Sequence, residues 1–328
     1  MWLAWPHYRA DWPGKFSPIP WVYGEIVRHI AAREKVNLLV RNAAEEKAVR
    51  KVLESAHAKL SNVKFFHIQT NRSWLRDSGP IFVRGPKGKT IMDFASRGWA
   101  KYPNYKLDNK IRESINETLK LPLIKPMHKG RHVVLEGGGI DVNGKGSLLT
   151  SEEWLLSDVQ VRNPGFTRED YEEIFEKYLG ATNTIWLGDG IVGDDTHGHI
   201  DDLARFVSPS AVVTVVERDK KSPNHAALAD NLKRLKRARD ERGRQLDVIE
   251  LPMPQTLYFE GQHLPVSYAN FLILNDCVLM PTFNDKLDRI ALNTLAQCFP
   301  KREVIGIHAV DLILGLGTLH CLSQQEPA

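Results

Sequence analysis

Ten consecutive residues, 193–202 (GDDTHGHIDD), contain four aspartates and two histidines. Buried charges must be paired or must bind a ligand, so this density of acids and imidazoles indicates a functional site rather than a plain surface loop. Such groups serve two kinds of chemistry. They can hold a metal ion through nitrogen and oxygen ligands, or they can surround a cationic substrate and move its protons.

The first alternative is a zinc-dependent hydrolase that uses residues 197–202 (HGHIDD). Histidines two residues apart, here His197 and His199, can bind one zinc ion, and the following aspartates add oxygen ligands. The segment is similar to the HxHxDH signature of metallo-β-lactamase-type hydrolases, with Asp202 at the position of the last histidine. The later histidines fall in unrelated predicted elements, however. Their positions count against a metal site, so the zinc hydrolase is the less favoured alternative.

The second alternative is a site for a guanidinium group. A planar guanidinium presents paired N–H donors that match carboxylates, and two or three acids can surround it. A cysteine thiolate could attack its central carbon, while a histidine passes protons to the departing ammonia and from the incoming water. These residue types occur in four glycine-flanked segments, namely residues 71–80, 135–139, 189–202 and 315–321.

A structural pattern recurs along the chain and places these four segments. Two strands, a helix and a further strand follow one another four times, and the first hundred residues fit a looser fifth copy. The predicted hairpins are 79–94, 139–151, 203–217 and 268–283, the helices 107–119, 167–180, 224–243 and 285–299, and the single strands 132–138, 184–190, 247–253 and 303–310. The pattern predicts an α/β fold whose modules close around an axis. A doubly wound sheet is the competing topology, but the sequence lacks its glycine-rich phosphate loop.

The polar segments lie between a module's single strand and the next hairpin, so a ring of modules would bring them together at one end of its axis. The residues gathered there would be Trp74, Asp77, Glu136, His199, Asp201 and Cys321. Each also has a structural interpretation, such as a turn for Asp77 or an ion pair of Glu136 with Arg76, Arg131 or Arg205. Because all six residues occupy the same place in the repeated pattern, we favour a single cavity that they line together over six separate structural roles.

The composition excludes several other classes of protein. The chain has 328 residues, of which 42% are hydrophobic and 26% charged, and we expect one catalytic domain over residues 1–328. A net charge of +4 is too small to indicate binding to nucleic acid, and no apolar run is long enough to cross a membrane. We expect a cytoplasmic protein that acts on a small molecule. A homo-oligomer is the commonest quaternary state.

Five motifs, taken in order, resemble the agmatine deiminases and Porphyromonas-type peptidyl-arginine deiminases of the guanidino-group-modifying (pentein) superfamily. They are WLRDSGPIFV, LEGGGIDVNGKGSLLTSEEWLL, VRNPGFTRED, GDDTHGHIDDLARFV and HCLSQQEP. The motifs span nearly the whole chain and are specific as a set. The resemblance implies a five-module ββαβ propeller with pseudo-fivefold symmetry. It also implies hydrolysis of a guanidine to a ureido compound and ammonia, without cofactor or metal.

The resemblance further implies a role for each candidate residue. Cys321 would attack the guanidinium carbon to give an S-alkylthiouronium intermediate. His199 would protonate the leaving ammonia and then activate water. Asp77 and Asp201 would hold the guanidinium nitrogens, and Glu136 would orient His199 or the substrate. The remaining substrate-binding surface would come from Trp74, Gly317 and His197.

The chain departs from the family pattern at positions that face the far end of the substrate. Arg72 stands where an acid is common, and His197 stands where Asp or Asn is usual. Leu316 and Thr318 replace Gly and Asn in the run before Cys321. Agmatine carries a second cation at its far end. The resemblance favours agmatine, hydrolysed to N-carbamoylputrescine and ammonia, and the alternative is a deiminase of peptidyl or free arginine or another guanidine compound.

Overall fold

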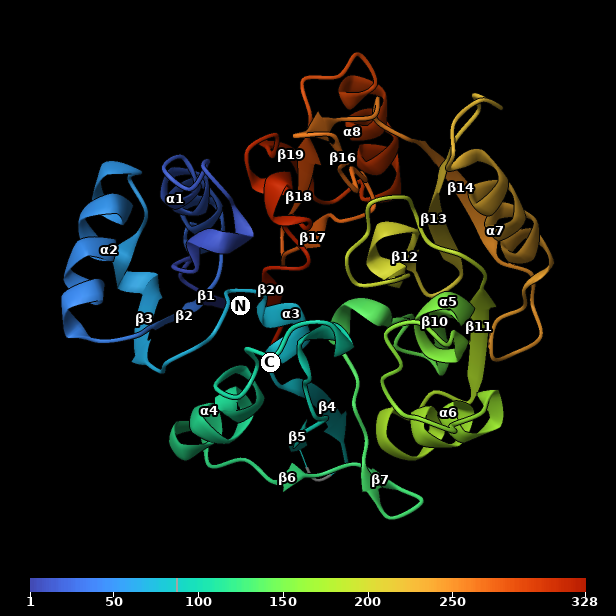
Figure 1. Cartoon of the computed structure of the whole chain (residues 1–328), viewed down its shortest axis with the longest axis horizontal. Coiled ribbons are helices and arrows are strands. Elements are labelled where there is room, and N and C mark those ends of the chain that lie inside the picture. Colours follow the sequence, from blue (N-terminus) through green and yellow to red (C-terminus); the bar gives the residue numbers. More distant parts are fainter. Residues whose placement is uncertain (87) are drawn as a thin grey trace.

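The chain folds into helix-and-strand units that follow one another in a ring, with both termini near the centre of the ring (Figure 1). This computed structural model describes residues 1–86 and 88–328. The last strand, β20 (Ser323–Gln324), pairs antiparallel with the first, β1 (Trp2–Ala4). The two ends of the sequence thus close one sheet, and the segment just before β20 is held at the centre.

The remaining strands have the following bounds. They are β2 (Val36–Val40), β3 (Val63–His67), β4 (Ile81–Gly85), β5 (Gly88–Met92), β6 (Leu123–Ile124), β7 (Met127–His128), β8 (Arg131–His132), β9 (Asp141–Val142), β10 (Ser147–Ser151), β11 (Asn183–Leu187), β12 (Ala204–Ser208), β13 (Ala211–Val216), β14 (Asp247–Pro252), β15 (Tyr258–Phe259), β16 (Gln262–His263), β17 (Leu272–Ile273), β18 (Cys277–Thr282) and β19 (Glu303–His308).

The sheets repeat one topology. Their strand orders are β20-β1-β2-β3, β4-β5-β6, β9-β10-β11, β12-β13-β14 and β17-β18-β19, with the pairs β7-β8 and β15-β16 beside them. In the last four of the larger sheets, two antiparallel strands are followed by a parallel third strand. A parallel partner requires a crossover, and helices supply it. The four predicted hairpins are confirmed, and the fold is a mixed α/β fold.

The helices lie on the outside of the ring (Figure 1). They are α1 (Ile19–Ala31), α2 (Ala43–Ser55), α3 (Leu75–Ser78), α4 (Ile111–Leu119), α5 (Glu152–Leu156), α6 (Arg168–Ile174), α7 (His225–Arg237) and α8 (Asp288–Cys298). The short helices α3 and α5 are exceptions, because α3 lies near the centre of the ring and Trp154 of α5 packs against His199. Helix α6 begins at a capping box of Thr167 and Asp170, and its π-helical extension ends at Gly180, where φ is 69°. This agrees with the helix predicted over 167–180.

Two sequence predictions of elements are wrong, the first of them in part. The helix predicted over 224–243 ends at Arg237, because the Asp240 carboxylate accepts hydrogen bonds from the backbone of Arg242 and Arg244 and forms a turn. The strand predicted over 132–138 does not form. Only His132 belongs to a strand, β8, Val134 makes an isolated parallel bridge with Ala95, and the parallel third strand of the sheet of β4 and β5 is β6. Residues Gly137–Gly139 form a 3-10 turn instead.

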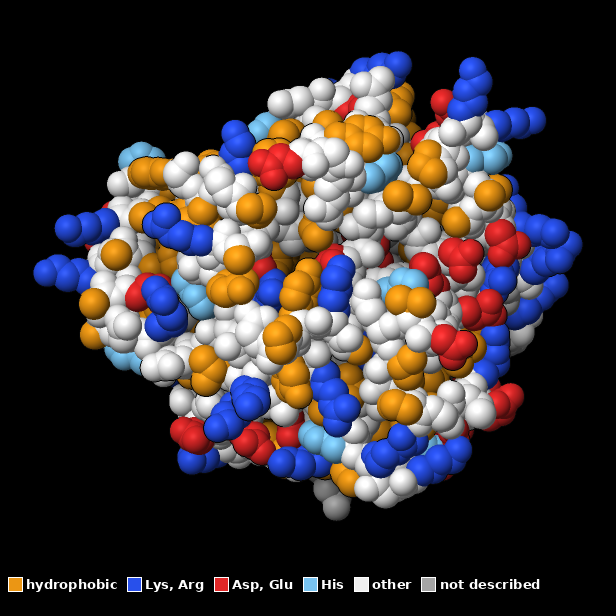
Figure 2. All heavy atoms as spheres, in the orientation of Figure 1, with side chains coloured by type: hydrophobic (Ala, Val, Ile, Leu, Met, Phe, Trp, Pro, Cys, Tyr) orange, Lys and Arg blue, Asp and Glu red, His pale blue; other side chains and the backbone are white. Residues whose placement is uncertain are grey.

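The sheets bury most of their apolar residues. In β13 the side chains of Val212, Val213 and Val215 are all fully buried, because helices and neighbouring strands cover both faces. Cys277 is buried, whereas Cys298 is only half-buried. Over the described ranges, none of the helices combines the length and hydropathy needed to span a bilayer. Lys and Arg side chains are distributed around the visible face rather than gathered in one patch (Figure 2).

Candidate active site

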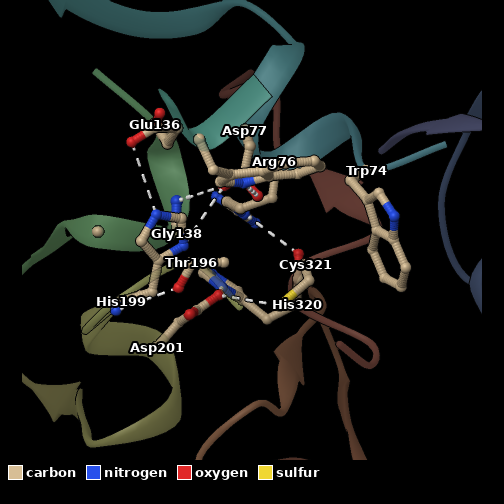
Figure 3. Close-up of polar contacts among 12 residues, drawn as sticks. Trp74, Arg76, Asp77, Glu136, Gly138, Thr196, His199, Asp201, His320 and Cys321 are labelled. Carbon is tan, nitrogen blue, oxygen red and sulfur yellow. Dashed lines mark hydrogen bonds and ion pairs between the residues drawn. The ribbon is translucent and has the colours of Figure 1, made fainter. Parts of the chain in front are cut away.

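The segments predicted to meet do so at the centre of the ring (Figure 3). Asp77 comes from α3, and Glu136 immediately precedes the glycine turn 137–139. His199 and Asp201 lie at the 3-10 turn Ile200–Asp202, and Cys321 precedes β20. Four distant parts of the sequence thus supply one cluster, as the repeat pattern predicted.

A cavity of about 560 Å³ leads to this cluster. We call it the catalytic cavity. The described residues that line it include Trp74, Asp77, Trp99, Gly317 and Cys321 at its inner end and Asp11, Arg72, Lys101, Tyr102 and Asp195 towards its far end. Glu136, His199 and Asp201 are at most 1% exposed and lie behind this lining. The inner end of the cavity therefore adjoins a buried set of acids and imidazoles.

His199 is held between two carboxylates. Its Nδ1 lies 3.7 Å from Asp77 Oδ1, and its Nε2 lies 3.6 Å from Glu136 Oε2. Burial lowers the pKa of His199, but the charges of Asp77 and Glu136 outweigh burial and raise this pKa to about 9. The imidazole is therefore protonated at neutral pH and can donate a proton. Both ring nitrogens are buried and lack a hydrogen-bond partner among the described residues.

Glu136 is fixed and kept ionised by residues around it. Its Oε2 accepts a hydrogen bond of 2.8 Å from Trp154 Nε1, and Arg162 Nε lies 3.2 Å from the same oxygen. Burial raises the pKa of Glu136, but Arg162, His199 and Trp154 together outweigh burial and bring this pKa to about 2. The sequence suggested Arg76, Arg131 or Arg205 as the partner. That suggestion was wrong, because Arg162 fills the position.

The other two acids differ from Glu136, because the pKa of each is raised overall. Asp77 accepts hydrogen bonds from Gly138 N (3.1 Å) and Trp99 Nε1 (2.9 Å). Burial raises the pKa of Asp77, and it raises that of Asp201 to about 7. Asp201 Oδ1 is buried without a hydrogen-bond partner in the described ranges. An arriving cation would stabilise the ionised form of both acids.

Cys321 sits in a strongly negative environment. Its Sγ lies 3.5 Å from Asp201 Oδ2 and 3.0 Å from Asn270 Nδ2, which donates to it. Burial raises the pKa of the Cys321 thiol well above its usual value, and the charges of Asp201 and Asp202 raise it further. The thiol is protonated when the cavity is empty. A cation next to it would lower its pKa.

The far end of the catalytic cavity contains two paired acids. Asp11 forms an ion pair with Arg72, and its other oxygen accepts a hydrogen bond of 2.9 Å from Trp74 Nε1. Asp195 forms an ion pair with Lys101 and accepts a hydrogen bond from Tyr102 through its second oxygen. All four carboxylate oxygens thus already have donors from the chain.

His197 does not reach the catalytic cavity. Its Nε2 lies 3.0 Å from Ser157 Oγ, and its Nδ1 lies 3.5 Å from Glu153 Oε1. This position does not support the prediction that His197 binds substrate. His197 and His199 also contact different partners, so they do not form a pair of metal ligands. Among residues 1–86 and 88–328 no three His, Cys, Asp or Glu side chains are placed to hold a metal ion.

The whole chain matches a known family. The model of the Porphyromonas-type peptidyl-arginine deiminases matches residues 1–327. The chain belongs to this family. It is 31% identical over 352 residues to the agmatine deiminase of Pseudomonas syringae pv. tomato, covering 100% of this chain and 92% of the relative.

Solved structures agree with this membership. The agmatine deiminase of Enterococcus faecalis is 29% identical and has a TM-score of 0.89, covering 99% of this chain and 92% of that one. A C. jejuni agmatine deiminase with substrate bound is also 29% identical, with a TM-score of 0.86 and coverage of 98% and 91%. The mixed α/β fold of this deiminase-family chain is therefore the fold of those enzymes.

Sequence reasoning missed several residues of this deiminase-family site. His320 Nδ1 lies 2.7 Å from Asp201 Oδ2, and Asn270 Oδ1 accepts hydrogen bonds from Thr318 and His320. Asn270 stands in an otherwise apolar hairpin, where a buried polar side chain signals a partner. Arg162 lies in the VRNPGFTRED motif, so its position in a quoted motif was the available signal.

Gly138 tests how closely the site is packed. A methyl group on its Cα would stand 2.5 Å from His199 Nδ1 and 2.9 Å from Asp77 Oδ1. Such contacts displace both side chains, so we expect Gly138→Ala to lower kcat/KM about 100-fold. Gly85→Ala is the matched control, because a methyl group there would meet nothing within 4 Å. Equal activity of the two variants in a steady-state assay would contradict this geometry.

Proposed function

We propose that this chain is a cysteine-dependent guanidine deiminase that hydrolyses agmatine to N-carbamoylputrescine and ammonia. The observation that carries the proposal is the convergence of one thiol, one protonated imidazole and two acids of raised pKa. Cys321 and Asp77 line the inner end of a cavity that a linear guanidine can enter, and His199 and Asp201 lie buried directly behind them.

The proposed reaction has two halves, and each is balanced. The guanidinium binds between Asp77 and Asp201, and Cys321 Sγ attacks its central carbon. A C–S bond forms, a C–N bond breaks, and His199 gives its proton to the leaving ammonia. His199 then takes a proton from water, whose oxygen attacks the same carbon. The C–S bond breaks, and the ureido product and the thiol are released.

The arriving substrate activates the nucleophile. Because the Cys321 thiol is protonated in the empty cavity, the free protein is a poor nucleophile. A guanidinium held by Asp77 and Asp201 neutralises the charges that raise the thiol pKa. The thiol then gives its proton to solvent water in the cavity when the substrate is bound, and it regains a proton from the protonated ureido product when the C–S bond breaks. The empty enzyme is protected from unwanted reactions of its cysteine.

The other site residues support this chemistry. Glu136 is ionised and fixed by Arg162, so it orients His199 and stabilises its charge. Trp74 and Gly317 line the path of the substrate stem, and a methyl group on Gly317 would stand 2.9 Å from the Trp74 ring. We assign no substrate contact to His197.

The fold is part of the proposal. We infer that residues 1–328 form one catalytic domain built as a five-module ββαβ propeller with pseudo-fivefold symmetry. The five sheets of three or four strands, arranged in chain order around the cluster, support this inference. Such a ring explains why the catalytic residues come from successive junctions between modules. The partner is a small guanidine compound.

A second candidate substrate is arginine, free or in a peptide. It is favoured by the far end of the catalytic cavity, where the oxygens of Asp11 and Asp195 already accept hydrogen bonds from the chain. A second ammonium group finds no unoccupied carboxylate there, whereas a carboxylate or peptide group meets Lys101 at the rim. The direct test compares agmatine, arginine, a blocked arginyl peptide and methylguanidine, measuring ammonia and ureido product. Failure of all four would contradict the deiminase proposal.

Lys101→Met tests the two substrates against each other. The variant frees Asp195 Oδ1 for a second ammonium and removes a positive charge from the rim. We expect the kcat/KM ratio of agmatine to arginine to rise about five- to tenfold. Lys47→Met, an exposed lysine on α2, is the control and should leave the ratio unchanged. An unchanged ratio in Lys101→Met would show that this end does not select the substrate.

The pH dependence follows from the pKa values of the free enzyme. The reaction requires Cys321 as thiolate and His199 protonated, and the thiol pKa lies above the His199 pKa of about 9. Below pH 9 the thiolate fraction grows about tenfold per pH unit, so kcat/KM should rise steeply from pH 6 to 8 and level off near pH 9. A flat profile between pH 6 and 8 would contradict the assignment.

A further inference from the structure

A second cavity lies behind the segments that carry the nucleophile. Its volume is about 830 Å³. Neighbouring residues alternate between the two cavities, because Asp77 and Cys321 line the catalytic cavity while Arg76 and His320 line the second. The backbone at 76–77 and 320–321 therefore forms a shared wall. We call the second space the rear cavity; its other described lining residues include Arg84, Gly137, Asp141, Lys145, Arg205 and Gln324.

Arg76 is a buried guanidinium with an unused donor in this wall. Its side chain belongs to a residue that is only 3% exposed. Arg76 Nε donates to the backbone oxygen of His320 at 3.2 Å, but Nη2 is buried and has no hydrogen-bond partner among the described residues. A buried donor of a charged group is costly when unpaired, so a ligand that accepts from it would stabilise the site.

The charges around the rear cavity favour an anion. Arg84, Lys145 and Arg205 add three positive charges to its lining, against the one carboxylate of Asp141. Both oxygens of Asp141 are occupied, by Arg205 Nε at 2.9 Å and by Phe206 N at 2.6 Å. The carboxylate cannot also serve Arg76. A cavity lined by charges of one sign concentrates ions of the other sign.

Gln324 adds a buried acceptor close to Arg76. Its Oε1 has no hydrogen-bond partner in the described part of the chain. A methyl group built on Gly137 would stand 3.1 Å from Arg76 Cδ and 3.4 Å from Gln324 Oε1, so the two side chains flank one point. The site thus offers a charged donor next to a neutral acceptor. An oxyanion that keeps a proton matches both, because its oxygens accept from Arg76 and its O–H donates to Gln324.

We propose that the rear cavity is a binding site for inorganic phosphate, held by the Arg76 guanidinium and the Gln324 carbonyl. Phosphate retains a P–OH group at neutral pH, whereas sulfate has the same shape without a proton. Comparing the two anions therefore distinguishes specific recognition of the P–OH group by Gln324 from nonspecific attraction of any anion. Binding requires no turnover, so the outcome is independent of the proposed deiminase function.

The test is calorimetric titration of the full chain with phosphate, sulfate and chloride at pH 7 and constant ionic strength. We expect saturable phosphate binding, sulfate binding at least about tenfold weaker, and no chloride binding. Gln324→Met keeps the size of the side chain and should reduce phosphate affinity to that of sulfate. Lys145→Met, at an exposed position of the lining, should weaken phosphate binding about two- to fivefold.

Lys101→Met is the matched control, because Lys101 lines the catalytic cavity instead. It should leave phosphate affinity unchanged. The proposal is overturned if phosphate gives no saturable heat, if phosphate and sulfate bind equally, or if Gln324→Met binds phosphate as the parent does. The proposal is also overturned if Lys101→Met loses phosphate binding while Lys145→Met keeps it, because the anion would then lie in the catalytic cavity.

Discussion

Replacing Cys321 with serine is expected to lower deiminase turnover by about 10⁴-fold or more. A serine hydroxyl has a far higher pKa than a thiol, and the acids around this position, Asp201 among them, raise it further. The bound guanidinium can lower a thiol pKa into an accessible range but not that of an alcohol. The side chain changes by one atom, so substrate binding and stability should be nearly unchanged.

The control for this prediction is Cys298→Ser. Cys298 is half-buried at the end of α8 and lies outside the catalytic cavity. We expect it to keep parental kcat/KM in the ammonia-release assay. Substantial turnover by Cys321→Ser, at the same folded concentration, would exclude Cys321 as the nucleophile. Equal loss in both variants would indicate a general effect of cysteine replacement.

His199→Gln is expected to give the second-largest effect, a loss of about 10²- to 10⁴-fold in kcat/KM. Glutamine has a similar length but can neither give a proton to ammonia nor take one from water. It also leaves Asp77 and Glu136 facing each other without the imidazolium between them. The pH profile is the second readout. The levelling near pH 9 should disappear in the variant, because the group that titrates there is gone.

His308→Gln is the matched control for His199→Gln. His308 is exposed at the end of β19 and lies outside the catalytic cavity. Its replacement should leave kcat/KM and the pH profile unchanged. A His199→Gln variant that is folded by circular dichroism and retains more than about a tenth of parental activity would show that His199 is not the general acid.

The proximity of the candidate active-site residues could be predicted from the sequence, because it depends on periodic features of the chain. Apolar strands, glycine-bounded turns and amphipathic helices repeat along the chain, and the polar segments recur at the same place in each repeat. That pattern predicts that Asp77, Glu136, His199 and Asp201 lie together with Cys321. The structure confirms their proximity.

The partners within the site could not be predicted, because they depend on three-dimensional packing. Arg162, rather than Arg76, Arg131 or Arg205, contacts Glu136. The hydrophobic periodicity of the sequence does not indicate which arginine side chain lies next to Glu136. His197 was misplaced for a local reason. Its backbone has a φ of 64°, which turns its side chain away from the face that carries His199.

The boundary errors have local chemical causes. Asp240 forms hydrogen bonds with the backbone of Arg242 and Arg244, so it ends a helical pattern that hydrophobic spacing alone would extend. The glycine turn at 137–139 replaces part of the predicted strand because Gly138 must approach His199 and Asp77 too closely for any other residue. In both places a functional or polar contact overrides the propensity of the segment.

The most direct test of the central claim is to detect the covalent intermediate on Cys321. The protein is mixed with agmatine, and separately with arginine, and quenched in acid within one turnover. Peptide mass spectrometry should find an adduct of the substrate minus ammonia on the C-terminal peptide that contains Cys321, with ammonia and ureido product formed in equal amounts. Turnover without any adduct on Cys321, abolished by a metal chelator, would contradict the account.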